Sequence, residues 1–418
     1  MRKKSFPDPK FLAVDFFCGA GGTTRGLIDA GGLVLAGLDN DKKYEKTYVS
    51  NNKNRRGDGK RPQSLPYDLS PKTRSHPAGE QHLALRDLAK ILPEAKRSFP
   101  GTPLLFSMCA PCQPFTKLSK QKITDRRYRK HVRDRSLLLQ CLVFVKRFRP
   151  DLVFCENVAG ITSSQYGDVW RQFSKQLEKI GYATGSDVIN AMNFGVPQSR
   201  KRSIMLAIKL RPRRKKYSSS STANKIIVPS KDPSATLRTV RETIGHLPAI
   251  RAGEMHAKIP NHATQTLRSL NIQRLKCAVP GESNAYLGHT KFGNLSLKCH
   301  RKANRRIGQR CFNDVYTRMH PDQPAPTITT RCLSVSNGRF GHYDVKQIRG
   351  ISLREAAFLQ SFPSRYVFYP ADKLVVPARM IGNAVPPRLA RFFVRYLLSL
   401  IASKNRSRPF IANRRKCL

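Results

Sequence analysis

The feature that most constrains this fold is a regular alternation of short apolar runs and amphipathic stretches over about the first 209 residues. The apolar runs predict strands at 11–17, 33–38, 104–108, 152–155 and 203–208. Helical periodicity occurs between them, at 25–30, 136–148 and 169–180. Strands that alternate with helices favour a mostly parallel sheet covered on both faces. We therefore expect an α/β fold.

The alternation stops after Ile208. A basic, serine-rich stretch follows at 211–221, and the chain to about 346 is irregular and rich in polar turns. Within it, 316–319 and 324–331 predict strands.

Helical periodicity returns at 352–360 and 389–401, and a basic tail ends the chain. We predict a discontinuous α/β domain made of 1–209 and 350–418. A smaller domain, 210–349, would be inserted between its two parts.

The charge of the chain points to a polyanionic partner. Lys and Arg number 77 against 27 Asp and Glu, a formal net charge of +50. Such an imbalance destabilises the compact state by self-repulsion, which nucleic acid would relieve. A solubility effect is the alternative explanation of the charge.

No apolar run approaches the roughly 20 residues of a membrane span, and ten scattered cysteines do not form a disulfide framework. We expect a cytoplasmic protein that associates with nucleic acid and does not contact a membrane.

A glycine-rich loop after the first predicted strand indicates a cofactor site. Gly19, Gly21 and Gly22 follow Phe17, and glycines here let the backbone approach a ligand closely. Asp39 ends the second predicted strand, about where an acid would meet ribose hydroxyls. Asp68 follows the next short run and could reach an adenine amino group. The alternatives are an ordinary strand-to-helix turn and a simple helix-capping Asp68.

Cys112 is the candidate nucleophile. It follows a predicted strand and lies between Pro111 and Pro114, which restrict the backbone around it. The basic residues of 117–133 would favour its thiolate and could also bind phosphates. Cys109 and Cys112 also form a C-x-x-C pair, so a redox pair or half a zinc site is the competing reading. No second C-x-x-C exists, and we expect no metal.

Glu156, Arg200 and Arg202 are the remaining candidate catalytic residues. Glu156 ends one predicted strand, and strand ends of a parallel sheet share one edge, where ligands bind. Period-two spacing places Arg200 and Arg202 on one side of the chain. Phosphate contact or a solvated edge is the alternative use of these arginines.

Taken together, these residues resemble the DNA (cytosine-5) methyltransferase family, with Rossmann-like S-adenosylmethionine-dependent catalytic domains. The match runs in the family's order over nearly all of the chain outside roughly 210–310 and the tails. The matching motifs are Phe17 to Gly22, Pro111 to Phe115, Glu156-Asn157-Val158, Gln198-x-Arg200-x-Arg202, Arg349 with 352–357 and 360–363, and Gly382 to Pro387. Asn40 departs from the pattern, because many relatives carry a large apolar residue there.

The resemblance implies a role for each base-side residue. Cys112 would add to carbon 6 of a cytosine flipped out of double-stranded DNA. Glu156 would contact ring N3, while Arg202, and with less support Arg200, would hold the base carbonyl and the Cys112 region.

The resemblance also implies S-adenosyl-L-methionine as cofactor. Phe17 would pack on its adenine, Asp39 would bind ribose and Asp68 the adenine edge. Asn383 and Ala384 would line the methionine end, and the domain at 210–349 would recognise the DNA sequence.

Two rival functions stay open at this point. One is a tRNA cytosine methyltransferase of the same fold, against which the large inserted domain argues. The other is a catalytically silent DNA-binding protein, against which the set of Cys112, Glu156 and the arginines argues.

We expect a monomer, with a cognate restriction endonuclease acting separately if the protein belongs to a restriction–modification system. Arg331 and Arg339 could read bases or, more commonly for arginine, contact phosphates.

Overall fold

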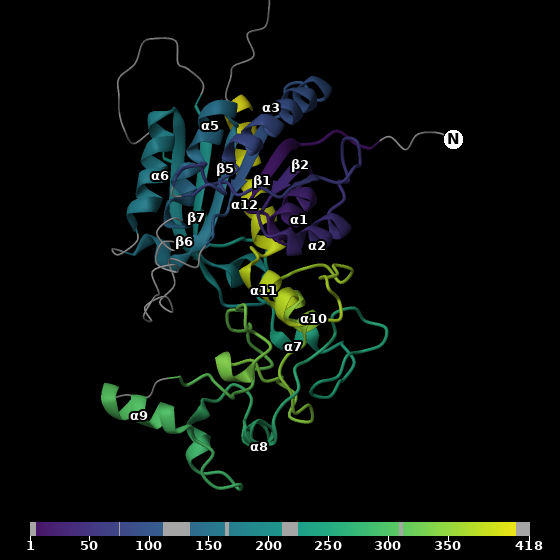
Figure 1. Ribbon diagram of the computed structural model, residues 1–418, viewed down its shortest axis with the longest axis vertical. Helices are drawn as coiled ribbons and strands as arrows, with labels where there is room; N and C mark the ends of the chain where they lie inside the picture. Colours follow the sequence, from purple (N-terminus) through teal and green to yellow (C-terminus); the bar gives the residue numbers. More distant parts are fainter. Residues whose placement is uncertain are drawn as a thin grey trace, which may run out of the picture.

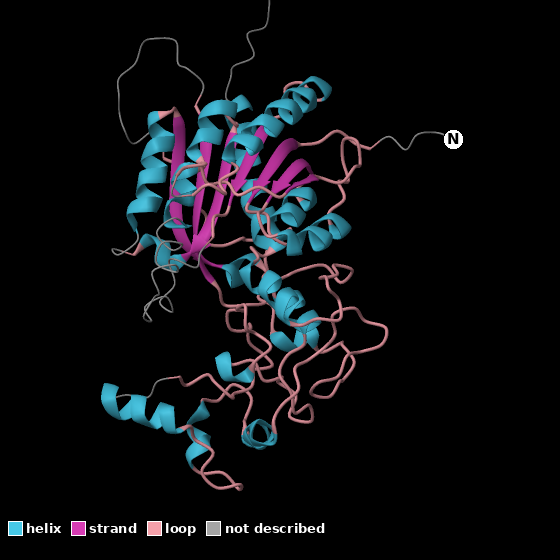
Figure 2. Ribbon diagram, in the orientation of Figure 1, coloured by secondary structure: helices cyan, strands magenta, loops and turns pink. Residues whose placement is uncertain are grey.

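The computed structural model describes residues 6–74, 76–111, 134–163, 167–210, 225–308 and 312–406. Figure 1 shows two lobes. The sheet lobe holds the strands and the helices packed on them, and the small lobe below it consists mainly of loops and short helices (Figure 2).

The sheet lobe is built on seven strands in the order β3-β2-β1-β4-β5-β7-β6. Neighbouring strands are parallel, except that β7 runs antiparallel to both β5 and β6. This confirms the expected α/β class. The strands are β1 (Phe11–Phe16), β2 (Gly32–Leu38), β3 (Gln63–Leu65), β4 (Leu104–Met108), β5 (Leu152–Val158), β6 (Tyr182–Asn190) and β7 (Lys201–Lys209).

Helices cover both faces of this sheet, so its central strands are apolar on both sides. Val14 and Phe16 pack in a core with residues of α3, α5 and α6, whereas Phe11 and Ala13 pack in a second core with α1 and α12. The helices of the sheet lobe are α1 (Gly22–Asp29), α2 (Glu45–Asn51), α3 (Gln81–Ser98), α5 (Leu142–Phe148), α6 (Gly167–Lys179) and α12 (Pro387–Arg406).

Strand β6 is absent from the sequence-based prediction. It lies at the edge of the sheet and has three consecutive exposed residues, Ser186, Asp187 and Val188. An edge strand with polar residues carries little of the apolar signal that marks the central strands. Strand β5 continues beyond the predicted end at Cys155, which places Glu156 within the strand.

The small lobe contains α7 (Val240–Ile244), α8 (Ser269–Cys277) and α9 (Lys298–Ile307), with α10 (Leu353–Leu359) and α11 (Val375–Asn383) nearer the sheet lobe (Figure 1). The prediction of strands at 316–319 and 324–331 is wrong. Apart from single bridges such as Pro280 to Arg318 and Gln198 to Ala325, the described chain here forms no ladder. The buried Arg318 guanidinium instead satisfies backbone carbonyls, those of Leu275, His342, Asp344 and Gln347.

One hydrophobic core of the small lobe crosses the predicted boundary at 349/350. It joins Val240, Met319 and Ile328 to Leu353 and Ile381. A separate outer core contains Leu275, Leu287, Leu295 and Val315. The domain boundaries themselves stay a prediction.

None of the described helices is both long and apolar enough to cross a membrane.

Candidate active site

The glycine-rich loop turns sharply between β1 and α1. Phe17, Gly19 and Gly21 have φ angles of 58°, 52° and 88°, in the left-handed region that favours glycine. A Cβ atom on Gly21 would lie 2.2 Å from Asn52 Nδ2, and one on Gly22 would lie 2.5 Å from the Val385 carbonyl oxygen. Bulkier residues at these two positions would therefore displace the loop from the elements behind it.

Asp39, at the end of β2, faces this loop. Its carboxylate accepts hydrogen bonds from the backbone N–H groups of Gly19 and Asp41, each at 2.9 Å. Burial raises the pKa of Asp39, despite those two hydrogen bonds. Each carboxylate oxygen still has a lone pair that a ligand hydroxyl could use.

Asp68 lies between β3 and α3, also in contact with the pocket. Its carboxylate accepts from the Ser70 backbone N–H at 2.9 Å and lies 2.9 Å from His76 Nε2. Burial tends to raise the pKa of Asp68, but the hydrogen bonds from Ser70 and His76 lower it overall. The side chain is thus held as an acceptor at the pocket wall.

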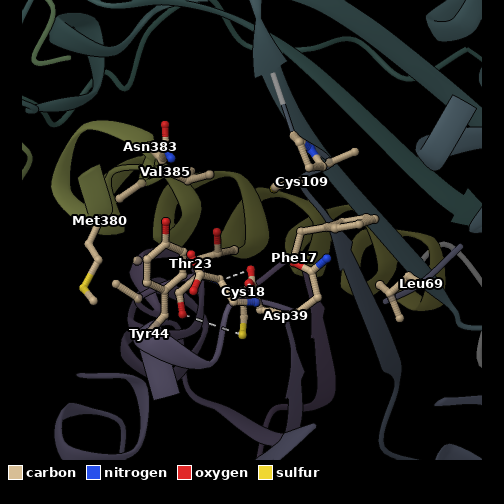
Figure 3. Close-up of a pocket in the computed structure, with 18 of the residues that line it drawn as sticks. Phe17, Cys18, Thr23, Asp39, Tyr44, Leu69, Cys109, Met380, Asn383 and Val385 are labelled. Carbon is tan, nitrogen blue, oxygen red and sulfur yellow. Dashed lines mark hydrogen bonds between the residues drawn. The ribbon is translucent and has the colours of Figure 1, made fainter. Parts of the chain in front are cut away.

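A pocket of about 310 Å³ opens at the carboxyl ends of β1, β2, β4 and β5, within the usual size of a small-molecule site. Figure 3 shows Phe17, Asp39, Tyr44 and Asn383 around it. Its described lining includes five acids, Asp39, Asp41, Asp68, Asp134 and Glu156, and a single basic residue, Arg379. In a chain of net charge +50, this acidic lining favours a ligand with positive charge.

Asn383 and Ala384 close the pocket from the C-terminal part of the chain, at the end of α11. The end of this helix is held by Gln360, whose side-chain N–H donates to the Ile381 carbonyl at 2.6 Å. Gln360 in turn accepts from Gln198 Nε2 at 2.7 Å. Gln198 and Ile381, which are 183 positions apart in the sequence, are therefore linked through Gln360 and fix this wall together.

Glu156 and Arg202 form a buried ion pair, with Arg202 Nε 2.9 Å from Glu156 Oε1 and each side chain 9% exposed. Antiparallel pairing of β5 with β7 places Val158 opposite Arg202 and brings the two side chains together. Glu156 lines the pocket, and Arg202 holds it there.

The segment that leads to Cys112 lies against the same strand. Asn157 is buried, and its Nδ2 donates to the Ala110 carbonyl at 3.0 Å. Pro111 lines the pocket, whereas Cys112 lies outside the described residues. Burial raises the pKa of the neighbouring Cys109 thiol well above its ordinary value. This favours the neutral form of Cys109, which is the less reactive one.

Arg200 lies apart from the pocket lining. Its guanidinium donates to the Ile328 carbonyl at 2.8 Å and to the Gly382 carbonyl at 3.0 Å. A Cβ atom on Gly382 would lie 2.3 Å from the backbone of Thr329, so the two segments touch. Because Arg200 directly precedes β7, these contacts join the sheet lobe to the small lobe. The catalytic role predicted for Arg200 stays a prediction, and its geometry favours a positioning role.

The structure thus places Phe17, Gly19, Gly22, Asp39, Asp68, Asn383, Ala384 and Glu156 around one pocket. Gly21 supports the loop from behind, and Arg202 acts through Glu156. Sequence reasoning gave no role to Tyr44, Asn157 or Arg379. Asn157 could have been found from its place beside Glu156. Arg379 lies four residues before Asn383, on the same face of α11, but no helix was predicted there.

Comparison with known proteins agrees with this geometry. A sheet of this order with one reversed strand, and a pocket at the strand ends, is the Rossmann-like methyltransferase fold. Residues 81–399 match the C-5 cytosine-specific DNA methylase family, and the chain belongs to that family. It is a DNA (cytosine-5-)-methyltransferase.

Among its relatives is the type II methylase M.HgiDII of Herpetosiphon aurantiacus. The two are 34% identical over 380 residues, which cover 90% of this chain and 92% of the relative. The type II methyltransferase M1.HphI of Haemophilus parahaemolyticus is 27% identical over 395 residues, covering 93% and 86%. The fold also matches a solved E. coli prophage protein described as a DNA modification methyltransferase, with a TM-score of 0.55, 19% identity, and coverage of 94% of this chain and 99% of that one.

Proposed function

We propose that this enzyme methylates carbon 5 of cytosine within a specific double-stranded DNA sequence, using S-adenosyl-L-methionine bound in the acidic pocket and Cys112 as nucleophile. One observation carries the proposal. The acidic pocket is lined both by the glycine loop and by Glu156 and Pro111, so a cofactor there would adjoin the residue that precedes Cys112.

The charges of the pocket fit this cofactor. S-adenosyl-L-methionine carries a sulfonium, an ammonium and one carboxylate, and the described lining offers five acids and Arg379. Asp39 would hold the ribose hydroxyls, Asp68 the adenine edge, and Phe17 would pack on the ring. Asn383 and Ala384 would contact the methionine end, and Gly19 and Gly22 would allow close backbone approach. When bound, the cofactor supplies an electrophilic methyl group.

The protein's own groups prepare the base. The Cys112 thiolate forms a bond to carbon 6 of the flipped cytosine, which makes carbon 5 nucleophilic. Glu156, once protonated, donates a hydrogen bond to ring N3 and stabilises the negative charge that develops there. Arg202 orients Glu156 and contacts the base carbonyl. After carbon 5 has gained its methyl group, a base removes the carbon 5 proton and the bond to Cys112 breaks.

The small lobe would read the DNA sequence, because every group assigned to chemistry lies outside 210–349. Sequence reading needs side chains that reach base edges in the grooves. We further propose that the enzyme acts as a monomer. Its resemblance to type II methylases suggests a separate restriction endonuclease as its functional counterpart.

The test is a covalent trap. In DNA containing 5-fluorocytosine, the fluorine blocks loss of the carbon 5 substituent, so the bond between sulfur and carbon 6 persists. The native enzyme with cofactor should form an adduct that survives denaturation. Cys112→Ala should form none and show methyl transfer at the level of a no-enzyme control, yet bind DNA. Cys109→Ala is the matched control and should form the adduct. An adduct with Cys112→Ala, or methylation of tRNA in preference to duplex DNA, would overturn the proposal.

A further inference from the structure

Helix α9 is an unusually basic element at the outer end of the small lobe. Within Lys298–Ile307 it contains Lys298, Arg301, Lys302, Arg305 and Arg306, and none of its residues is buried. The whole stretch 283–313 contains no Asp or Glu. Figure 1 shows α9 projecting from the small lobe, at the opposite end of the molecule from α3.

Four of these side chains form one exposed face, which we call the α9 basic face: Lys298, Lys302, Arg305 and Arg306. At 3.6 residues per turn they fall within an arc of about 100°. In the described part of the chain, no ion pair joins them to a carboxylate.

The rest of the helix fixes its orientation. Arg301 donates to Ser296 Oγ at 2.7 Å, and the ring of His300 stacks on Phe312 with 4.9 Å between centroids. These contacts join α9 to the segments just before and just after it, and its basic face stays exposed.

The charges of α9 oppose its own stability. Lys298 and Lys302, and likewise Lys302 and Arg306, are like charges four residues apart, an arrangement that destabilises a helix. Lys298 also lies in the first turn, next to the positive end of the helix dipole, and Leu297 provides no side-chain cap. An external polyanion would remove this repulsion.

We propose that the α9 basic face binds the phosphate backbone of duplex DNA flanking the methylated site. This rests on the proposed function, which places duplex DNA against the small lobe. The basic face has no aromatic side chain to stack on the bases of a single strand. The opposite face offers His300, Ala303, Asn304 and Ile307, too little apolar area for insertion into a membrane surface.

The test compares two sets of three substitutions in the full-length enzyme. Lys302→Gln, Arg305→Gln and Arg306→Gln neutralise α9. Lys90→Gln, Lys96→Gln and Arg97→Gln remove the same charge from exposed positions of α3. The α9 variant should bind flanked duplex about tenfold more weakly or worse, with or without the target site. Its log–log salt dependence should become shallower by about 0.9 for each phosphate that the variant no longer neutralises.

Two further readouts separate binding from folding. The charge-retaining variant Lys302→Arg, Arg305→Lys, Arg306→Lys should bind like the native enzyme. On a duplex that covers only the target site, the α9 variant should lose little affinity. The kcat for methyl transfer at saturating DNA should stay unchanged.

The inference is overturned if the α9 and α3 variants lose equal affinity for flanked duplex. It is also overturned if the α9 variant loses binding only to single-stranded RNA or to anionic vesicles. In both cases adduct formation by Cys112 would still stand. A native enzyme that binds no duplex DNA would instead overturn the proposed function along with this one.

Discussion

Asn157 shows how one buried residue can control a neighbouring loop. Its side-chain amide N–H bonds the Ala110 carbonyl at 3.0 Å, and its Oδ1 accepts from the Val158 backbone N–H at 2.9 Å. The amide therefore fixes the approach to Cys112 relative to the end of β5, where Glu156 lies. This makes Asn157 a positioning residue rather than a catalytic one.

Asn157→Ala should lower kcat by about one to two orders of magnitude, because a small misplacement of a nucleophile is costly in rate. It would also remove a hydrogen bond from the buried Ala110 residue, at a cost of about 0.5–1.5 kcal/mol. Single-turnover methyl transfer measures the rate, and calorimetry measures cofactor affinity, which should change little. The exposed Thr162→Ala, in the short helical segment Ala159–Thr162 that follows β5, is the control. A native kcat in Asn157→Ala would show that the hydrogen bond does not position the loop.

Helix α10 is held by a buried charged cluster at its N-terminus. Ser352 and Glu355 form a reciprocal capping box, and Glu355 also receives two hydrogen bonds from Arg349, at 2.7 and 2.8 Å. Burial alone would raise the pKa of Glu355, but the bonds and charge of Arg349 lower it to about 2. His342 completes the cluster, with Nε2 3.5 Å from Glu355.

We predict that the stability of this lobe falls in acid because of His342. Burial lowers its pKa from 6.5 to about 4, against the opposing charge of Glu355. Its Nδ1 accepts from the Asp344 backbone N–H at 3.2 Å, which requires that nitrogen to be unprotonated. Below pH 6.5 the unfolded chain gains a proton that the folded chain does not, so stability falls as pH falls from about 6.5 to 4. The loss should reach about 3 kcal/mol.

Thermal denaturation at a series of pH values checks this. His342→Asn should flatten the decline in Tm between pH 6.5 and 4, whereas the exposed His289→Asn should not. An equally steep decline in His342→Asn would assign the acid sensitivity to other groups.

At the scale of the whole molecule, the two lobes are joined by buried contacts rather than by a free linker. Arg200, directly before β7, bonds carbonyls of Ile328 and Gly382. The hydrophobic core of the small lobe includes residues on both sides of 350 and also Ala20 from the glycine-rich loop. The predicted insert at 210–349 therefore shares its core with the segment after it.

Replacing 210–349 with the equivalent part of a relative should move the methylated sequence to the relative's site, because base-reading side chains would come from the small lobe. Cofactor affinity should change little. The chimera should lose stability, because the shared core would combine residues from two parents. A second chimera that also exchanges 350–370 should recover part of it. Bisulfite sequencing identifies the site, and an active chimera that kept the original site would place recognition in the sheet lobe.

The sequence by itself determined the α/β class, the central strands and eight of the residues that line the pocket, among them the glycines of the loop, Asp39 and Glu156. This was possible because buried strands carry an uninterrupted apolar signal, and because glycines and acids at strand ends must share one edge of a parallel sheet. Only the tertiary structure decided that Arg200 joins the lobes while Arg202 pairs with Glu156. It also showed that α11 brings Arg379 to the pocket. Where strands were predicted around Arg318, the buried guanidinium of Arg318 instead donates hydrogen bonds to backbone carbonyls. These facts depend on long-range contacts between side chains, which local periodicity and spacing do not encode.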